Sequence, residues 1–437
     1  MEDRFLAVGV AVLLLVTVIL WFIRFFGEMG ADFGTNRFAG WCLGRKDYEG
    51  EPLEGAEIVR VFGKAFLVRI LFYLAGFFIC TYFVEYYASM EQFTFENFLE
   101  SWERWDARHY INLADLGYQD YIEDGQHLFL VFFPLYPWVV RIVHYVISDW
   151  RLACLCASTL AFCIGSVFFY GAVKEEYGKK IAERAFWLIS LYPFSFFFGG
   201  MMTESLFFCF LSAGFFYIRR HKWFTAGVIG IFCSLCRVQG VLLLGVGLVE
   251  FFVTYRPIDA IRQKRFLQFV KRFMTKGIWL FLTLFGNLIY FGINQRVEGD
   301  PFRFQVYQKE HWYHEATFVS NCLSEIVSYA KGAEEQMRIA VWFPELVLFV
   351  LAFICILYSL RRHPLRMSAF LFVYTLVNYS VTFLISGGRY MACALPMFII
   401  LAEGTKKKKW LYSLILLISL CLLGVYFRAY MSGWQVM

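Results

Sequence analysis

Residues 5–21 read FLAVGVAVLLLVTVILW, a stretch without a single charged side chain. Similar apolar blocks recur along the chain, and about 20 apolar residues in a helix are enough to cross ~30 Å of hydrocarbon. The sequence is 59% apolar and 17% charged, against roughly 45–50% and 25% in soluble domains. No small-residue cleavage pattern follows the first block, which predicts a retained helix rather than a signal peptide. The chain is therefore predicted to be an all-α polytopic membrane bundle of about 12 crossings.

Four basic clusters set the predicted orientation of these crossings. They lie at Arg219–Lys222, residues 256–276, residues 361–366 and Lys406–Lys409. Short basic loops are typical of the cytoplasmic side, so the net charge of +6 indicates membrane topology rather than nucleic-acid binding. Two crossings fit between successive clusters, which places the loop 295–340 on the outer face. The loop 86–128 lies on the same face if residues 5–26 enter the membrane and residues 61–84 leave it. The predicted spans include residues 185–198, 201–218, 367–385 and 391–403.

Residues 129–147 break the alternation of crossings, because this segment and the next one, 152–172, must both begin outside. Pro134 and Pro137 interrupt this block, and each lacks a backbone N–H and disturbs a helix. We predict a re-entrant or interfacial piece, which survives at membrane depth only when protein or water covers it. The alternative is that this block crosses and one of the short 14-residue blocks does not.

Cysteine and histidine spacing predicts neither a disulfide framework nor a metal site. Most of the twelve cysteines stand alone in apolar blocks, where they are typical of small buried hydrophobes; examples are Cys80, Cys163, Cys209 and Cys355. His311, His314 and Glu315 have no further strong ligand at a diagnostic spacing. The sequence leaves a requirement for a divalent metal open.

The stretch Trp102–Tyr110, WERWDARHY, is the first motif with chemistry. Helical spacing puts Asp106, His109 and Tyr110 on neighbouring faces. A carboxylate among aromatic rings could accept a proton from an attacking hydroxyl. The alternative is an interfacial helix whose tryptophans and tyrosines form a membrane belt.

Arg237 and Arg389 stand between apolar blocks on the predicted outer side, away from the basic clusters. Arginines in that setting are costly and are functional candidates by default. A planar guanidinium suits a lipid phosphate, although an arginine can also reach the interface from an apolar helix.

Two acids complete the set of outer-side motifs. Glu204 opens an apolar helix after Thr203, and an acid in a first turn is explained by helix capping alone. Asp300 follows a glycine and precedes Trp312. Polar groups among aromatic side chains suit a sugar or a lipid headgroup, so both regions are candidates for substrate binding.

The motifs, in this order, resemble the PIG-V family of mannosyltransferases, related to GPI mannosyltransferase 2. The order over roughly residues 100–400 carries the resemblance, since no single box is specific, and Leu113 stands where the family usually has isoleucine. Asp300 and Trp312 resemble the bacterial members. The matched stretches are Trp105–Ala107, Tyr110, Leu113–Ala114, Gly117–Tyr118, Phe132–Tyr136, Pro193–Phe198, Thr203–Phe207, Arg237–Gly240, Arg389–Tyr390 and Pro396.

The resemblance implies a GT-C glycosyltransferase that takes a sugar from a polyprenyl phosphate on the outer or lumenal face. It implies Asp106 as the catalytic acid or base of an inverting hexose transfer, with mannose as the sugar and a glycan or glycolipid hydroxyl as acceptor. Donor-phosphate binding is assigned to Arg237 and Arg389, with Arg108 and His109 as lesser candidates. The candidate substrate-binding residues are Trp105, Tyr110, Glu204, Asp300, Trp312 and Tyr390.

The same resemblance divides the chain and suggests where it works. Residues 1–60 form an extra N-terminal transmembrane helix and cytoplasmic loop with no assigned role, and residues 61–437 form the catalytic membrane domain. A bacterial plasma membrane is expected, with the active site facing outside. Two other classes stay open: a transporter or flippase of a lipid-linked sugar, which would need two access states, and a non-catalytic membrane subunit.

Overall fold

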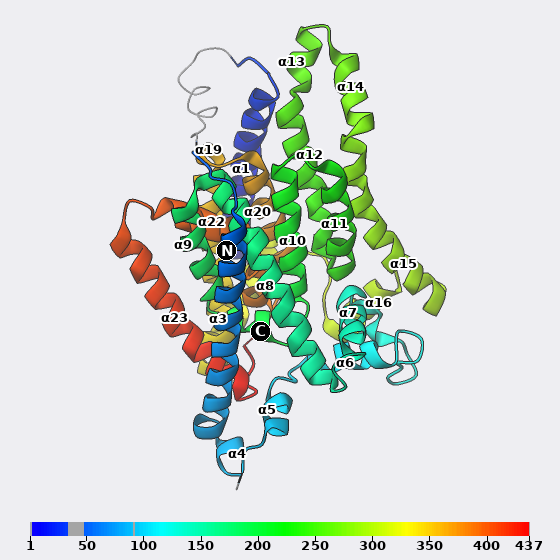
Figure 1. Ribbon diagram of the computed structural model, residues 1–437, viewed down its shortest axis with the longest axis vertical. Helices are drawn as coiled ribbons and strands as arrows, with labels where there is room; N and C mark the ends of the chain where they lie inside the picture. The colour runs from blue at the N-terminus through cyan, green and yellow to red at the C-terminus, as the bar shows by residue number, and fades with distance from the viewer. Residues whose placement is uncertain (1, 34–47, 91, 437) are drawn as a thin grey trace.

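The computed structural model describes residues 2–33, 48–90 and 92–436 of the chain. Within these ranges the protein is helical and has no β-strand, only two isolated bridges. The helices run mostly along the long axis of the molecule (Figure 1). The predicted all-α bundle is therefore confirmed. Part of the predicted loop 27–60 falls on residues 34–47, outside the described ranges.

Seven helices in the described chain are long and apolar enough to cross a membrane. Four of them are single helices: α1 (Glu2–Glu28), α3 (Gly55–Phe83), α8 (Trp150–Tyr177) and α23 (Lys409–Met431). Three are composite: η3, α12 and α13 (Val238–Val241, Leu242–Tyr255, Pro257–Arg262); α14, η4 and α15 (Phe266–Thr275, Gly277–Thr283, Leu284–Glu298); and α18, the π-turn η5 and α19 (Glu335–Met337, Arg338–Trp342, Phe343–Arg362).

Five shorter helices fill the rest of the bundle, and several end before the predicted spans do. They are α9 (Lys179–Ser190), α10 (Glu204–Arg219), α11 (Trp223–Cys236), α20 (Leu365–Asn378) and α22 (Leu395–Gly404). The predicted span 185–198 was wrong at both ends, 367–385 extended beyond the end of α20, and 391–403 began before the start of α22. Pro193 explains the early end of α9, because the residue before a proline is disfavoured in a helix.

Residues 129–147 form a short helix and not a crossing. α7 (Leu135–His144) has ten residues, about 15 Å of helix at 1.5 Å per residue, which is half of the hydrocarbon thickness. The turn η1 (Leu128–Val131) precedes it. Pro134 occupies the N-cap of α7 and Pro137 lies in its first turn, where a missing N–H costs no hydrogen bond.

The two ends of the bundle differ in charge. We call the end with the basic clusters the basic end, and α13 and α14 project from it at the top of Figure 1. The opposite end, here the cavity end, gathers the predicted outer segments, among them α4, α5 and α6 at the bottom of the view. Its helices are α4 (Glu85–Ala88), α5 (Phe95–Ser101), α6 (Ala107–Asp115), α16 (Arg303–Trp312), α17 (Val319–Gly332) and α21 (Gly387–Met391).

The chain between α9 and α10 is irregular and buried, including the turn η2 (Ser195–Gly199). Side chains of α3 and α8 satisfy its carbonyl oxygens. Arg69 donates to Ser195 O at 2.7 Å, and Tyr73 Oη donates to Gly199 O at 3.0 Å. Ser158 Oγ donates to the next carbonyl at 2.7 Å. Non-helical backbone can therefore persist here without water, as membrane interiors require. The segment leads directly to Glu204 at the start of α10.

Candidate active site

Asp106 lies at the start of α6. The strained backbone of the residue before it, Trp105, sets the direction of the Asp106 side chain. Trp105 has a φ of 46°, a left-handed conformation that is unusual for a bulky side chain. The Asp106 carboxylate makes no capping bond to α6. It instead accepts a hydrogen bond from Arg389 Nη1 at 2.7 Å, and 22% of its side chain is exposed. Asp106 is thus the accessible anion of the site.

Glu204 is fully buried and binds both candidate arginines. Its Oε1 accepts from Arg237 Nη2 and from Arg389 Nε, whereas its Oε2 has no hydrogen-bond partner in the described chain. α10 begins at Glu204 after Thr203, as predicted. The Thr203 hydroxyl, however, makes no capping bond and accepts from Arg237 Nε at 2.8 Å. This pair of residues therefore positions cations rather than only starting a helix.

Arg237 is presented by a sharp break between α11 and η3. Gly240 permits the break, because a Cβ atom there would lie 2.1 Å from Cys233 O. The Arg237 guanidinium lies 5.3 Å from the Tyr390 ring centroid. Its Nη1 has no acceptor among the described residues. A buried donor without a partner costs about 1–3 kcal/mol, and this arginine keeps the N–H groups of Nη1 uncommitted.

Arg389 is held by a tight turn at the start of α21. Glu345 Oε1 accepts from Gly387 N at 2.6 Å. A Cβ atom at Gly387 would lie 1.8 Å from Glu345 Oε2, so the close approach requires glycine. Tyr374 Oη donates to Tyr390 O at 2.8 Å on the other side of the turn. The Gly-Gly-Arg-Tyr motif is thus a rigid mount for Arg389.

Asp106, Arg237 and Arg389 line one cavity of about 420 Å³ at the cavity end. Three glutamine and two histidine side chains give it further polar groups: Gln239, Gln308, Gln435, His311 and His314. Aromatic rings form much of the remaining wall, among them Trp105, Tyr110, Phe132, Trp312, Tyr313, Phe383 and Tyr390. A cavity that joins charges, amides and aromatic faces suits a sugar linked to a phosphate.

Three aromatic residues around this cavity have strained backbones. Trp105, Tyr313 and Phe383 have φ values of 46°, 56° and 49°, and all three line the cavity. They are the only aromatic residues with positive φ in the described chain, apart from one histidine. Such strain costs about 1–3 kcal/mol per residue and clusters at functional sites. The strained backbone conformations and the charged side chains therefore lie around the same cavity.

Four predicted side chains line the cavity besides the charged ones, and four predicted side chains do not. Trp105, Tyr110, Trp312 and Tyr390 line it. Arg108 is exposed outside it. His109 stacks on Phe129 at 4.1 Å and bonds to a tyrosine hydroxyl. Asp300 Oδ1 accepts from Phe302 N at 2.9 Å and stabilises the start of α16. Glu204 does not line the cavity, but it binds Arg237 and Arg389, which do.

Several cavity residues were not predicted. Gln435 comes from the C-terminal end, and Tyr313, Phe383 and Ser386 come from irregular segments. Burial lowers the pKa of His314, while the charge of Asp106 acts in the opposite direction. No sequence signal separated these residues from other loop residues. In the part of the chain that the structure describes, no three His, Cys, Asp or Glu side chains gather as a metal site.

The fold is similar to that of ArnT from Cupriavidus metallidurans, solved with bound undecaprenyl phosphate. The TM-score is 0.50 at 11% sequence identity, and the alignment covers 88% of this chain and 77% of ArnT. ArnT has the GT-C fold, so the predicted GT-C-like architecture is confirmed. At this identity the likeness concerns the fold alone.

Two structures of an Archaeoglobus fulgidus oligosaccharyltransferase, one tethered to an acceptor peptide and one in the apo form, are more distant. Both give a TM-score of 0.44, at 11% and 13% identity, and this chain spans 56% of their length. No family model matches the sequence, and no curated protein does. The resemblance to the PIG-V family therefore stays a prediction.

Proposed function

We propose that this chain is a membrane glycosyltransferase that moves a hexose from a polyprenyl-phosphate sugar to an acceptor hydroxyl. The observation that carries the proposal is one cavity in which an accessible carboxylate, Asp106, stands beside two buried arginines, Arg237 and Arg389. The likeness in fold to ArnT, solved with undecaprenyl phosphate, agrees with a lipid-phosphate leaving group. Mannose as the sugar rests on the PIG-V resemblance.

In the proposed reaction Asp106 removes the proton from the acceptor hydroxyl as that oxygen attacks the anomeric carbon. The bond from this carbon to the phosphate oxygen breaks, and the electron pair leaves with the lipid phosphate. Attack from the face opposite the leaving group inverts the anomeric centre. Negative charge develops on the phosphate, where Arg237 and Arg389 are already fixed by Glu204. Preorganised cations at such a position stabilise the transition state.

We place the cavity on the outer face of the membrane, in a bacterial plasma membrane by the family resemblance. The four basic clusters lie at the opposite end of the bundle, and basic loops are retained on the cytoplasmic side. The acceptor is then a glycan or glycolipid that reaches the outer surface.

The test is a transfer assay with the full-length protein in detergent, polyprenyl-phosphate mannose and a panel of acceptors. Asp106→Asn should lower kcat by about 10²–10⁴, the usual contribution of a general base. Asp115→Asn is the matched control, because Asp115 is exposed at the far end of the same helix. Undiminished transfer by Asp106→Asn would exclude the proposed role, and lipid flipping without transfer would favour a transporter.

A further inference from the structure

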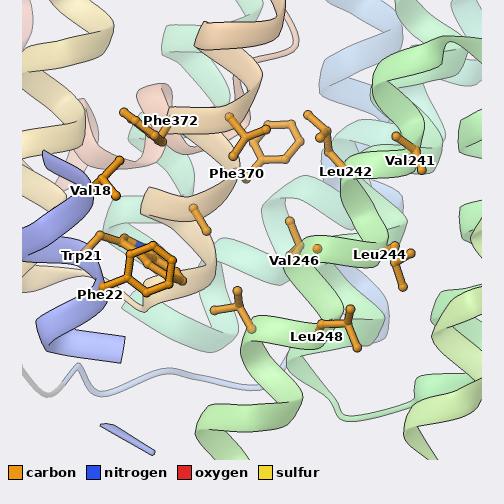
Figure 2. Close-up of a pocket in the computed structure, with 14 residues that line it drawn as sticks. Val18, Trp21, Phe22, Val241, Leu242, Leu244, Val246, Leu248, Phe370 and Phe372 are labelled. Atoms are coloured by element: carbon orange, nitrogen blue, oxygen red, sulfur yellow. The ribbon is translucent and has the colours of Figure 1, made fainter. Parts of the chain in front are cut away.

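A second cavity, of about 440 Å³, lies between α1, α12 and α20, and only apolar residues line it. We call it the apolar groove. Figure 2 shows α1 on one side, α12 on the other and α20 between them. Labelled side chains include Val18, Trp21 and Phe22 of α1, Leu244 and Leu248 of α12, and Phe370 of α20. The groove has no role in the function proposed above.

Toward the basic end, α1 and the residues that follow it contact α12 and α13. At the basic end the rings of Phe25 and Phe252 meet edge to face at 6.5 Å, and Arg262 donates to Gly30 O at 2.8 Å. These contacts bring α1 and α12 together. The lining from Val241 at the end of η3 to Val249 of α12 extends for about 12 Å. The groove is therefore elongated along the helices.

The groove begins beside the active-site cavity. Val238 and Gln239 of η3 line the cavity, and Val241 at the end of the same turn lines the groove. Gln239 Nε2 donates to Asn378 Oδ1 at 3.0 Å, which ties the start of α12 to the end of α20 between the two spaces. A molecule with its phosphate at Arg237 would find the apolar groove within one helical turn.

We propose that the apolar groove holds the polyprenyl tail of the donor, and that α1 forms one of its walls. The inference rests on the proposed function, since it assigns the tail of the same donor. A long hydrocarbon chain matches a lining without charged or amide groups, and the position of the groove beside the cavity, with both lined by residues of η3, selects the donor over an unrelated lipid. α1 belongs to the N-terminal segment outside the stretch that resembles the PIG-V family, and it gains a role as part of the donor site.

Gly245 provides a direct test, because it lines the groove and a Cβ atom there meets nothing within 4 Å. Gly245→Trp should fill the groove without displacing the protein. With a C55 polyprenyl-phosphate mannose, kcat/KM should fall about tenfold or more, because one isoprene unit buries several carbons. With a donor that carries a single isoprene, kcat/KM should barely change. Gly292→Trp, on α15 with equally open space, should affect neither donor. Equal losses with both donors, or none, would overturn the inference.

A binding readout separates this inference from the proposed function. The full-length protein is illuminated with a sugar-free C55 polyprenyl phosphate that carries a diazirine in its tail, and labelled peptides are mapped. Labelling of residues 18–22 that Gly245→Trp reduces supports the groove, even if no transfer is found. Transfer without labelling of α1 overturns the groove and leaves the function standing. Equal labelling by a diacyl phosphatidic acid with a diazirine in its acyl chain also overturns it, because the groove would then hold any bilayer lipid.

Discussion

Two clusters of two arginines and two carboxylates lie at opposite ends of this bundle. The cavity-end cluster consists of Asp106, Glu204, Arg237 and Arg389. The basic-end cluster consists of Glu176, Arg219, Glu250 and Arg366. α10 contributes to both, since Glu204 is its first residue and Arg219 its last. The composition is the same, yet the surroundings differ.

The basic-end cluster is packed as a clamp between helices. Arg366 donates to Glu250 Oε2 at 2.6 Å and also to Glu176, which joins α20 to α12 and α8. None of its four members lines the active-site cavity, whereas three members of the cavity-end cluster do. Buried ion pairs are weak evidence for stability, so composition alone cannot assign a role. The two clusters differ in that only the cavity-end cluster lines the active-site cavity.

The largest effect should come from the same substitution made in each cluster. Arg389→Lys should lower kcat by about 10²–10³, because a lysine offers one point charge where Arg389 contacts Asp106 and Glu204 at once. Arg366→Lys is the matched change at the basic end, and the transfer rate of its folded fraction should stay near wild type. A similar loss in both variants would mean that the two clusters share one role.

Removing the basic-end arginine should instead affect folding. Arg366→Met leaves Glu176 and Glu250 without their shared partner, and breaking a buried pair costs about 3–5 kcal/mol. The free energy of unfolding in mixed micelles measures this loss, and transfer is then assayed on the folded fraction. Unchanged stability together with lost transfer would contradict the assignment as a clamp.

A smaller loss of activity is expected when the mount of Arg389 is disturbed without touching its charge. Gly387→Ala places a Cβ atom against the Glu345 carboxylate and should move the turn. A shift of about 1 Å costs up to roughly 100-fold in rate, measured as kcat at saturating donor. Gly292→Ala is the control, because a Cβ atom there meets no neighbour within 4 Å. Full activity of Gly387→Ala would show that the turn tolerates movement.

The smallest effect is expected in the pH dependence of stability, through His314 at the cavity end. Burial lowers the pKa of His314 in the folded protein, whereas an unfolded histidine has a pKa of about 6.5. Between these values the unfolded state binds more protons, so stability should fall as the pH drops below about 6.5. The melting temperature of His314→Gln should depend less on pH across this window. An identical pH profile in the variant would show that other groups control the transition.

The apolar spans and the two arginines of the site could be predicted from the sequence for one physical reason, the cost of placing a charge in hydrocarbon. A charge in an apolar stretch is costly, so Arg237 and Arg389 stood out against their neighbours. Glu204 was added by the family resemblance, because helix capping alone explained it. The sequence could not show which face of α6 lines the cavity. The left-handed backbone at Trp105 sets the direction in which α6 begins, and this conformation was not predicted. Arg108 and His109 were lesser candidates for phosphate binding, chosen for their charge near Asp106, and neither lines the cavity.

Irregular segments account for most of what sequence could not predict. Tyr313 and Phe383 line the cavity through strained backbone conformations, which only tertiary contacts impose. The irregular segment after α9 is stabilised in a similar way, since Arg69 and Tyr73 of α3 donate to its carbonyl oxygens. Apolar periodicity carries no information about such contacts.

The shared carboxylate of Glu204 has a consequence for synthesis of the protein. Its two partners follow it by 33 and 185 residues, and a ribosome needs about 10–40 s for the longer distance. During that interval a helix with an acid at its end must wait in the translocation machinery or the bilayer. Arg237 can neutralise Glu204 early, but the site is complete only after Arg389 has been inserted. A chain truncated before α21 would therefore expose a half-paired acid, a feature that membrane quality control can recognise.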